Sequence, residues 1–223
     1  TDALILDIEK LRKNLCIDQW HLFGGSWGST LAILYGIKFP ENCLGFILRG
    51  IFLGSKSEID WFLYDINKFF PEAYNKFVSF VPKNHLKDIL GWFHTQLNIK
   101  NRSFNLKAAS FWAEYENSCS SLDYTPRPVS GENALAISKI ETHFFMNNCF
   151  LPENFIINNI HKISQIPAII VQGRHDVICP PFNALMLSKN WSASKIHIVD
   201  DAGHSAFENN IGRKLINALE MIK

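Results

Sequence analysis

One five-residue pattern limits, more than any other feature, what this chain can fold into. Ser26 stands between Gly24 and Gly28, after the apolar run 20–23 and before the Ala/Leu-rich run 30–35. This spacing is typical of a sharp strand-to-helix turn, in which the serine backbone is strained and glycines let neighbouring segments approach closely. We therefore expect the Ser26 hydroxyl to project from a sheet edge as a nucleophile. For these five residues alone, a Gly-rich turn with an incidental serine is an equally open interpretation.

The runs around this turn predict a parallel sheet. Residues 43–49 form a nearly continuous apolar run, as in a strand that is buried on both faces. A strand, a helix that stops before Pro40 and this second strand make a βαβ unit, which requires parallel strands. The other elements expected are helices at 2–15, 29–38, 181–190 and 209–222, and strands at 18–23, 166–173 and 195–199.

The middle of the chain has a different residue pattern. Between about residues 51 and 164 there is little strand-like alternation, and aromatic residues recur at helical spacings between prolines and glycines. Most of these aromatics are expected to pack between helices. The sequence thus predicts an α/β core in two parts, 1–51 and 165–223, with a helical cap, 52–164, inserted between the strands.

Composition excludes several classes of partner and cofactor. The 223 residues include 22 basic and 21 acidic side chains, so neither nucleic acid nor an anionic membrane is expected as a partner. Five scattered cysteines resemble free thiols of a reducing compartment, and no leader or apolar span of about 20 residues is visible. A soluble cytoplasmic protein is expected. No metal-ligand spacing or phosphate-binding loop occurs, so neither a metal nor a cofactor is expected. The oligomeric state is not determined.

Two later loops carry the partners that a nucleophilic serine needs. Asp176 follows the strand predicted at 166–173, and His204 follows the one at 195–199. Because the carboxyl ends of parallel strands meet at one sheet edge, Ser26, Asp176 and His204 are expected to converge there. Their order along the chain is that of α/β-hydrolases. The alternatives are that Asp176 caps the next helix and that His204 is an ordinary loop residue.

Proton chemistry assigns a role to each of these residues. Neutral His204 would take the proton of Ser26 as it attacks and later give it to the leaving amine. Asp176 would fix the tautomer of His204 and stabilise the imidazolium that forms. The backbone N–H of Trp27, at the start of the next helix, would donate to the developing oxyanion. A second serine pattern, Ser192-Ala-Ser-Lys195, leads into a strand rather than a helix and is attributed to chance.

The sequence resembles the proline iminopeptidases, the prolyl aminopeptidase group of α/β-hydrolase serine peptidases. The segments that carry the resemblance keep the family's order and span nearly the whole chain: Phe23 to Leu31, Leu48 to Phe52, Phe69 to Glu72, Trp112 to Glu116, Ile140-Glu141, Gly173 to Asp176 and Ala202 to Ser205. By resemblance, the reaction is release of an N-terminal proline from a peptide through an acyl-enzyme on Ser26. The implied partners are therefore peptides with an N-terminal proline.

The resemblance also implies a set of substrate-binding residues. Glu116 and Glu141 match the glutamates that anchor the substrate's ammonium, which suits a protonated prolyl nitrogen with two N–H donors. Phe52 matches an aromatic residue of the proline pocket, and Phe62 stands where the family usually has tyrosine. Arg49 lies beside this pocket, where it either contacts the far side of the substrate or braces the strand end. Read singly, each glutamate is better explained as a surface charge on a cap helix, and Glu114 is given that interpretation.

The chain departs from the family at its beginning. Members carry a His-Gly-Gly-Pro-Gly segment, in a loop that supplies half of the oxyanion hole, before the region where this chain starts. That segment and the first strands of the family's sheet are missing from this sequence, and one lost oxyanion donor costs about 3 kcal/mol. Two alternatives therefore stay open beside the aminopeptidase: an esterase or amidase acting on uncharged acyl groups, and a catalytically silent fragment or binding module.

Overall fold

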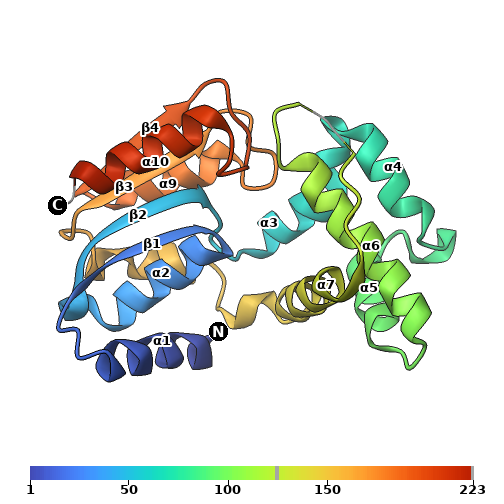
Figure 1. Ribbon diagram of the computed structural model, residues 1–223, viewed down its shortest axis with the longest axis horizontal. Helices are drawn as coiled ribbons and strands as arrows, with labels where there is room; N and C mark the ends of the chain where they lie inside the picture. Colours follow the sequence, from blue (N-terminus) through green and yellow to red (C-terminus); the bar gives the residue numbers. More distant parts are fainter. Residues whose placement is uncertain (124–125, 222–223) are drawn as a thin grey trace. The chain divides into compact units, whose positions relative to one another are not determined.

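The structure, a computed structural model, describes residues 1–123 and 126–221 and contains two compact units (Figure 1). Unit 1 combines Thr1–Gly54 with the chain from Leu151 onward, and unit 2 spans Ser55–Phe150. Each unit has its own secondary structure and its own buried side chains.

Unit 1 is built around a parallel four-stranded sheet, as the sequence predicts. The strands lie side by side in chain order: β1 (Trp20–Ser26), β2 (Cys43–Ile51), β3 (Ala168–Gly173) and β4 (Ser194–Val199). The helices of unit 1 are α1 (Asp2–Asn14), α2 (Trp27–Lys38), α8 (Phe155–Asn159), α9 (Pro181–Asn190) and α10 (Asn209–Met221), with 3-10 turns at Pro40–Asn42 and Ile160–Lys162.

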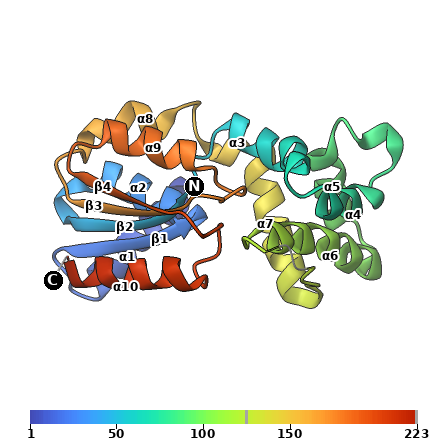
Figure 2. The ribbon, with the colours of Figure 1, turned by 90° about the horizontal axis from the view of Figure 1, so that it is seen from above.

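Helices cover both faces of the central strands. Figure 2 shows α8 and α9 on one side of the sheet and α10 on the other. Alternate residues of β2 enter different cores: Phe46 and Leu48 pack into the larger one with α2, α8 and α9, whereas Ile47 packs with Ile211 and Leu215 of α10. This two-sided burial explains why β2 is an almost unbroken apolar run.

Parallel pairing brings the ends of all four strands to one edge of the sheet. Ser26 ends β1 and is in register with Ile51 at the end of β2, while Gly173 pairs with Val199 at the ends of β3 and β4. The loops that follow β3 and β4 carry Asp176 and His204. The chemistry-bearing loops therefore leave the same edge of the sheet, where parallel α/β folds place their sites.

A buried ionic network attaches α1 to α2. The Glu9 carboxylate accepts hydrogen bonds from Arg12 Nε at 2.9 Å and Nη2 at 2.8 Å, and from the Tyr35 hydroxyl of α2 at 2.8 Å. Arg12 also donates to the carbonyl oxygens of Ile17 and Asp18, just before β1. These bonds, those from Arg12 foremost, lower the pKa of Glu9 to about 2.

We expect this network to make folding stability depend on acid pH. A carboxylate whose pKa is lower in the folded state than in the unfolded chain stabilises the fold above its unfolded pKa, and that contribution disappears as the pH falls toward the folded value. The free energy of unfolding in urea should therefore fall between about pH 4.5 and pH 2. The fall should be smaller in Glu9→Gln than in the wild type, whereas Asp7→Asn, which removes only an exposed pair with Lys10, should leave it unchanged. Equal pH dependence in Glu9→Gln and the wild type would contradict this role.

Unit 2 is helical and its core is aromatic. Its helices are α3 (Lys56–Asp60), α4 (Pro71–Ser79), α5 (Ile89–Asn98), α6 (Arg102–Cys119) and α7 (Gly131–Met146), with a π-helical turn at Trp61–Asp65 and 3-10 turns at Ile66–Lys68, Lys83–His85 and Asn148–Phe150. The Phe77 ring of α4 stacks on Phe93 of α5 at 4.8 Å and on Tyr115 of α6 at 4.3 Å between centroids. These rings hold the helices of unit 2 together. No helix among the described residues is both long and apolar enough to cross a bilayer.

The helical unit is shorter at its C-terminal side than the cap expected from the sequence. Residues 151–164 belong to unit 1, because Ile156, Ile160 and Ile163 are buried in the core beneath β2 and β3. At the other side, Leu53 also packs into that core. The sequence places residues 151–164 in the cap because they lack strand-like alternation, and such a pattern cannot tell which of two cores a helical segment joins.

Candidate active site

Ser26 has the strained backbone that its pattern predicts. It is the last residue of β1 and precedes α2, with φ 55° and ψ −125°, a conformation that is costly for a residue other than glycine. A Cβ atom at Gly24 would lie 2.2 Å from the Gly28 carbonyl oxygen, so the turn requires glycine there. The expectation for Gly28 itself is not met, because a Cβ at that position meets no described atom within 4 Å.

Hydroxyl groups in the first turn of α2 fix the elbow against the end of β2. Ser29 Oγ donates to the Ser26 carbonyl at 2.7 Å and accepts from the Phe52 N–H at 3.2 Å. Thr30 Oγ1 donates to the Phe52 carbonyl at 2.6 Å. Trp27 is the first residue of α2, so its backbone N–H lies at the N-terminal end of that helix. Its ring centroid lies 6.4 Å from that of Phe52, which places these two predicted site residues together.

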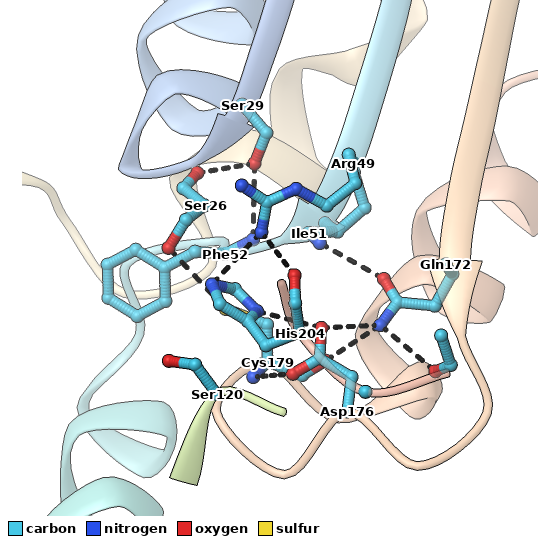
Figure 3. A network of polar contacts seen from close by, with 12 residues as sticks. Ser26, Ser29, Arg49, Ile51, Phe52, Ser120, Gln172, Asp176, Cys179 and His204 are labelled. Carbon is cyan, nitrogen blue, oxygen red and sulfur yellow. Dashed lines mark hydrogen bonds and ion pairs between the residues drawn. The ribbon is translucent and has the colours of Figure 1, made fainter. Parts of the chain in front are cut away.

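Asp176 and His204 are paired below the elbow, as Figure 3 shows. His204 Nδ1 lies 2.9 Å from Asp176 Oδ2, and the two residues are 7% and 2% exposed. The second carboxylate oxygen, Oδ1, accepts from the Cys179 N–H at 2.8 Å. A buried carboxylate held by fixed donors can orient an imidazole ring, which is the role predicted for Asp176.

Gln172 is a site residue that the sequence analysis missed. Its Nε2 donates to Asp176 Oδ2 at 3.0 Å and to the Cys179 carbonyl at 2.9 Å, and its Oε1 accepts from the Ile51 N–H at 3.1 Å. This fully buried amide thereby ties the acid loop to the end of β2 (Figure 3). The available signal was a lone polar residue in an otherwise apolar strand, because buried polar groups need partners.

Gly50 lets the histidine–aspartate pair lie close to β2. It has φ 54°, and a Cβ there would lie 2.9 Å from His204 Cε1 and 3.3 Å from Asp176 Oδ2. The glycine thus leaves the space that the imidazole and carboxylate occupy. Any side chain at this position would be strained and would push the pair away.

We expect Gly50→Ala to damage activity far more than folding. Displacing a catalytic group by about 1 Å costs about 10² in rate, and the positive φ adds about 1 kcal/mol of strain. Thermal melting and steady-state kinetics of the variant would separate the two effects. Gly212→Ala is a matched control, since its Cβ would meet the nearest described atom at 3.4 Å. A Gly50→Ala protein with wild-type kcat/KM would contradict the close packing of the pair.

Arg49 of β2 contacts the predicted base directly. Its Nη1 lies 2.8 Å from the His204 carbonyl oxygen and 3.1 Å from His204 Nε2. Ser26 Oγ contacts Cys179 Sγ at 4.0 Å. The sequence offered substrate contact or bracing of the strand end as roles for Arg49, and the bond to the His204 carbonyl is a bracing contact.

The negative charge of Glu116 acts on Glu141 within unit 2. Glu116 lies on α6 and Glu141 on α7, where Glu141 Oε2 accepts from Trp112 Nε1 at 2.5 Å. Burial, first, and the negative charge of Glu116, second, raise the pKa of Glu141 well above its usual range. Two neighbouring carboxyl groups in a desolvated place are suited to a bound cation, which would relieve both penalties.

Two other residues of unit 2, Phe62 and Glu114, have identifiable packing or ion-pair partners. Phe62 is buried, and its ring packs against Trp112 and Tyr115 at centroid distances of 5.8 and 5.2 Å. Its carbonyl oxygen accepts from the Tyr115 hydroxyl at 2.8 Å. Glu114, read from the sequence as a surface charge, forms an ion pair with Lys76.

The predicted site residues thus form one group in each unit. Unit 1 contains Ser26, Trp27, Arg49, Phe52, Asp176 and His204, and unit 2 contains Phe62, Glu116 and Glu141. Within the described part of the chain, no three histidine, cysteine, aspartate or glutamate side chains gather as metal ligands.

Comparison with known proteins identifies the family. A sequence profile described as alpha/beta hydrolase fold matches residues 1–211. A probable proline iminopeptidase of Leptolyngbya boryana is 40% identical over 97% of this chain and 70% of its own length. The chain belongs to the proline iminopeptidase family. A proline iminopeptidase of Xylella fastidiosa is 39% identical over 92% of this chain and 67% of its own length.

The same comparisons show how much of each relative's length this chain covers. A proline iminopeptidase of Arabidopsis thaliana is 39% identical over 99% of this chain but only 60% of its own length. The chain therefore spans between about three fifths and seven tenths of these family members. The family and its α/β-hydrolase fold support the prediction of a hydrolase.

Solved structures agree on the fold. A carboxylesterase of Nitrososphaera gargenis has a TM-score of 0.61 at 12% identity and covers 99% of this chain and 72% of its own. An esterase of Exiguobacterium antarcticum has a TM-score of 0.57 at 16% identity, with 98% and 72% covered. At these identities the likeness concerns the α/β-hydrolase fold alone, which confirms the predicted fold class.

Proposed function

We propose that the protein is a serine aminopeptidase that releases N-terminal proline from peptides through an acyl-enzyme on Ser26. The observation that carries this proposal is the hydrogen bond between His204 Nδ1 and Asp176 Oδ2, beside a serine held in a strained elbow. Relatives named proline iminopeptidase supply the substrate class.

The proposed reaction uses these groups in two half-reactions. Nε2 of His204 takes the proton of Ser26 as Oγ bonds to the prolyl carbonyl carbon, and the carbonyl electron pair moves onto its oxygen. The N–H of Trp27 donates to this oxyanion. When the carbonyl re-forms, the peptide C–N bond breaks and the leaving amine takes the proton from Nε2. Water then repeats these steps on the acyl-enzyme and releases proline.

Asp176 makes His204 suitable for this task. Its carboxylate accepts a hydrogen bond from the Nδ1–H group, which leaves the Nε2 lone pair to act as the base, and its negative charge stabilises the imidazolium. The donors from Cys179 and Gln172 keep the carboxylate in place.

The acidic pair of unit 2 is the proposed recognition site for the substrate's ammonium. A protonated prolyl nitrogen carries two N–H donors and a positive charge, and Glu116 and Glu141 offer two acceptors and negative charge. A charge-assisted hydrogen bond is stronger in surroundings that are shielded from water than it is in water. The apolar body of proline would pack on aromatic rings, for which Phe52 and Phe62 are the proposed contacts.

A substrate panel tests this function. The protein should release the reporter from a prolyl amide with a free N-terminus, and should cleave the N-acetylated prolyl amide and an alanyl amide much more slowly. Good hydrolysis of p-nitrophenyl acetate without any prolyl amide hydrolysis would instead establish the esterase alternative. A folded protein inert toward the whole panel, and toward a fluorophosphonate, would establish the catalytically silent alternative.

Neutralising either glutamate should lower the rate of peptide hydrolysis far more than the rate of ester hydrolysis. Glu116→Gln and Glu141→Gln should each lower kcat/KM for the prolyl amide by about 10- to 100-fold, the scale of a lost hydrogen bond to a charged group. The rate with p-nitrophenyl acetate should change little. Glu114→Gln is the matched control, because Glu114 lies on the same helix as Glu116 but pairs with Lys76 of α4 and has no proposed contact with substrate. Equal losses for amide and ester would contradict ammonium anchoring.

The raised pKa of Glu141 also sets the direction of a pH effect. As the pH falls through that pKa, Glu141 becomes neutral and loses its attraction for a cation. The kcat/KM for the prolyl amide should therefore fall on the acid side at a higher pH than it does for the neutral ester. Glu141→Gln should remove this difference between the two profiles, which are measured with the same enzyme preparation.

A further inference from the structure

Arg49 contacts two atoms of the predicted base, His204. A single guanidinium nitrogen, Nη1, reaches the His204 carbonyl oxygen at 2.8 Å and the ring nitrogen Nε2 at 3.1 Å (Figure 3). The same side chain lies against the elbow, since a Cβ at Gly25 would come within 2.6 Å of Arg49 Nη2. Arg49 therefore lies between the strand that carries Ser26 and the histidine that would activate it.

The chemistry of the guanidinium fixes the proton of His204. Arginine only donates hydrogen bonds, so Nε2 must accept from Arg49 through its lone pair. The ring proton then belongs to Nδ1, which donates to Asp176 Oδ2 at 2.9 Å. In this arrangement His204 is neutral and has the tautomer that a general base needs.

The same contact covers the atom that Ser26 needs. Nε2 has one lone pair in the ring plane, and it cannot accept fully from Arg49 and from the Ser26 hydroxyl at once. Arg49 must therefore leave Nε2 before Ser26 is activated. Because Nη1 carries two hydrogens, its hydrogen bond to the His204 carbonyl can persist when its hydrogen bond to Nε2 is broken.

The charge of Arg49 indicates what draws it away. Its two acceptors are a neutral imidazole and a carbonyl oxygen, and among the described residues it forms no ion pair with a carboxylate. A half-buried guanidinium in such surroundings has a strong preference for a carboxylate, which it can bind through two parallel hydrogen bonds. In a dipeptide the free carboxylate is separated from the scissile bond by a single carbon atom, so it enters the site together with that bond.

We propose that Arg49 is a positioning residue that covers His204 Nε2 in the resting enzyme and is drawn away by the free carboxylate of a short peptide. This inference rests on the proposed function for its substrate, and on unit 1 alone for its geometry. It predicts an enzyme that prefers dipeptides with a free C-terminal carboxylate over the corresponding amides.

The covering role is tested without a peptide. The rate at which a neutral fluorophosphonate labels Ser26 should rise several-fold in Arg49→Met, because Nε2 is then open to the serine. Arg174→Met is the matched control, since this exposed arginine on the loop after β3 pairs with Asp200 and should leave the rate unchanged. If Arg49→Met melts below the assay temperature, Arg49→Gln, which keeps a donor for the His204 carbonyl, replaces it. A folded variant that labels no faster than the wild type overturns the covering role.

The carboxylate is tested with Pro-Gly and Pro-Gly amide. The wild type should favour the free dipeptide by about tenfold in kcat/KM, the scale of one charge-assisted bond. Arg49→Met should lose this preference and Arg174→Met should keep it. An unchanged preference in Arg49→Met overturns carboxylate recognition. If neither peptide is cleaved but labelling still accelerates in Arg49→Met, the proposed function fails and the covering role stands.

Imidazole ¹⁵N spectra provide a readout that does not depend on turnover. In the wild type His204 should show a protonated Nδ1 and an unprotonated, hydrogen-bonded Nε2. In Arg49→Met the Nε2 resonance should move to the position of a free lone pair while Nδ1 stays protonated. A proton on Nε2 in the wild type overturns the assignment.

Discussion

Ser26→Ala should lower kcat for prolyl amides by about 10⁴-fold or more, because the variant has no oxygen that can form the acyl-enzyme. Folding should survive, since alanine removes one hydroxyl whose recorded contact is a 4.0 Å approach to Cys179. The measurement is steady-state release of the reporter, with thermal melting of the same preparation.

The control for this prediction is a second serine. Ser192 lies in a surface turn, bonded to Gln165 and to the Ser164 carbonyl, and belongs to the Ser-x-x-Lys pattern attributed to chance. Ser192→Ala should keep wild-type activity. Activity that survives Ser26→Ala, or that is lost in Ser192→Ala, would refute Ser26 as the nucleophile.

Asp176→Asn should have the second large effect, a loss of about 10⁴-fold in kcat. The carboxylate accepts three N–H groups: Cys179 N on Oδ1, and Gln172 Nε2 and His204 Nδ1 on Oδ2. An asparagine has one carbonyl oxygen, so its NH₂ must face one side of this arrangement. If it faces His204, Nδ1 becomes the acceptor, the ring proton moves to Nε2, and the base is lost.

Asp200→Asn is the matched control for the acid. Asp200 lies on the loop after β4 and pairs with Arg174 at the surface, so its neutralisation should change kcat by less than about twofold. The pair of variants is compared by kcat and by urea unfolding. A folded Asp176→Asn protein with near-wild-type kcat would show that His204 does not depend on Asp176.

The sequence predicted the frame of unit 1 well because its signals are local. An apolar run in β2, the helix after Ser26 and the loops holding Asp176 and His204 each follow from neighbouring residues. The order of the three residues and the parallel pairing then indicated one sheet edge, and the structure brings Asp176 and His204 into contact there.

What the sequence did not reveal depends on contacts between distant segments. Gln172 and Gly50 act through their closeness to Asp176 and His204. Gln172 belongs to no motif, and the segment Leu48 to Phe52, which contains Gly50, does not by itself indicate what this glycine contacts. The contact of Arg49 with His204 spans 155 residues of chain. The start of the second part of unit 1 at Leu151 cannot be seen in the sequence, because a short helix does not encode which core it will join.

The most direct test of the account is to trap its intermediate. The protein is mixed with a prolyl ester reporter, quenched in acid within the first turnovers, digested and analysed by mass spectrometry. The peptide containing Ser26 should gain the mass of one prolyl acyl group, and the gain should disappear in Ser26→Ala. Release of proline with Ser26 unmodified, or with the acyl group on another residue, would contradict it.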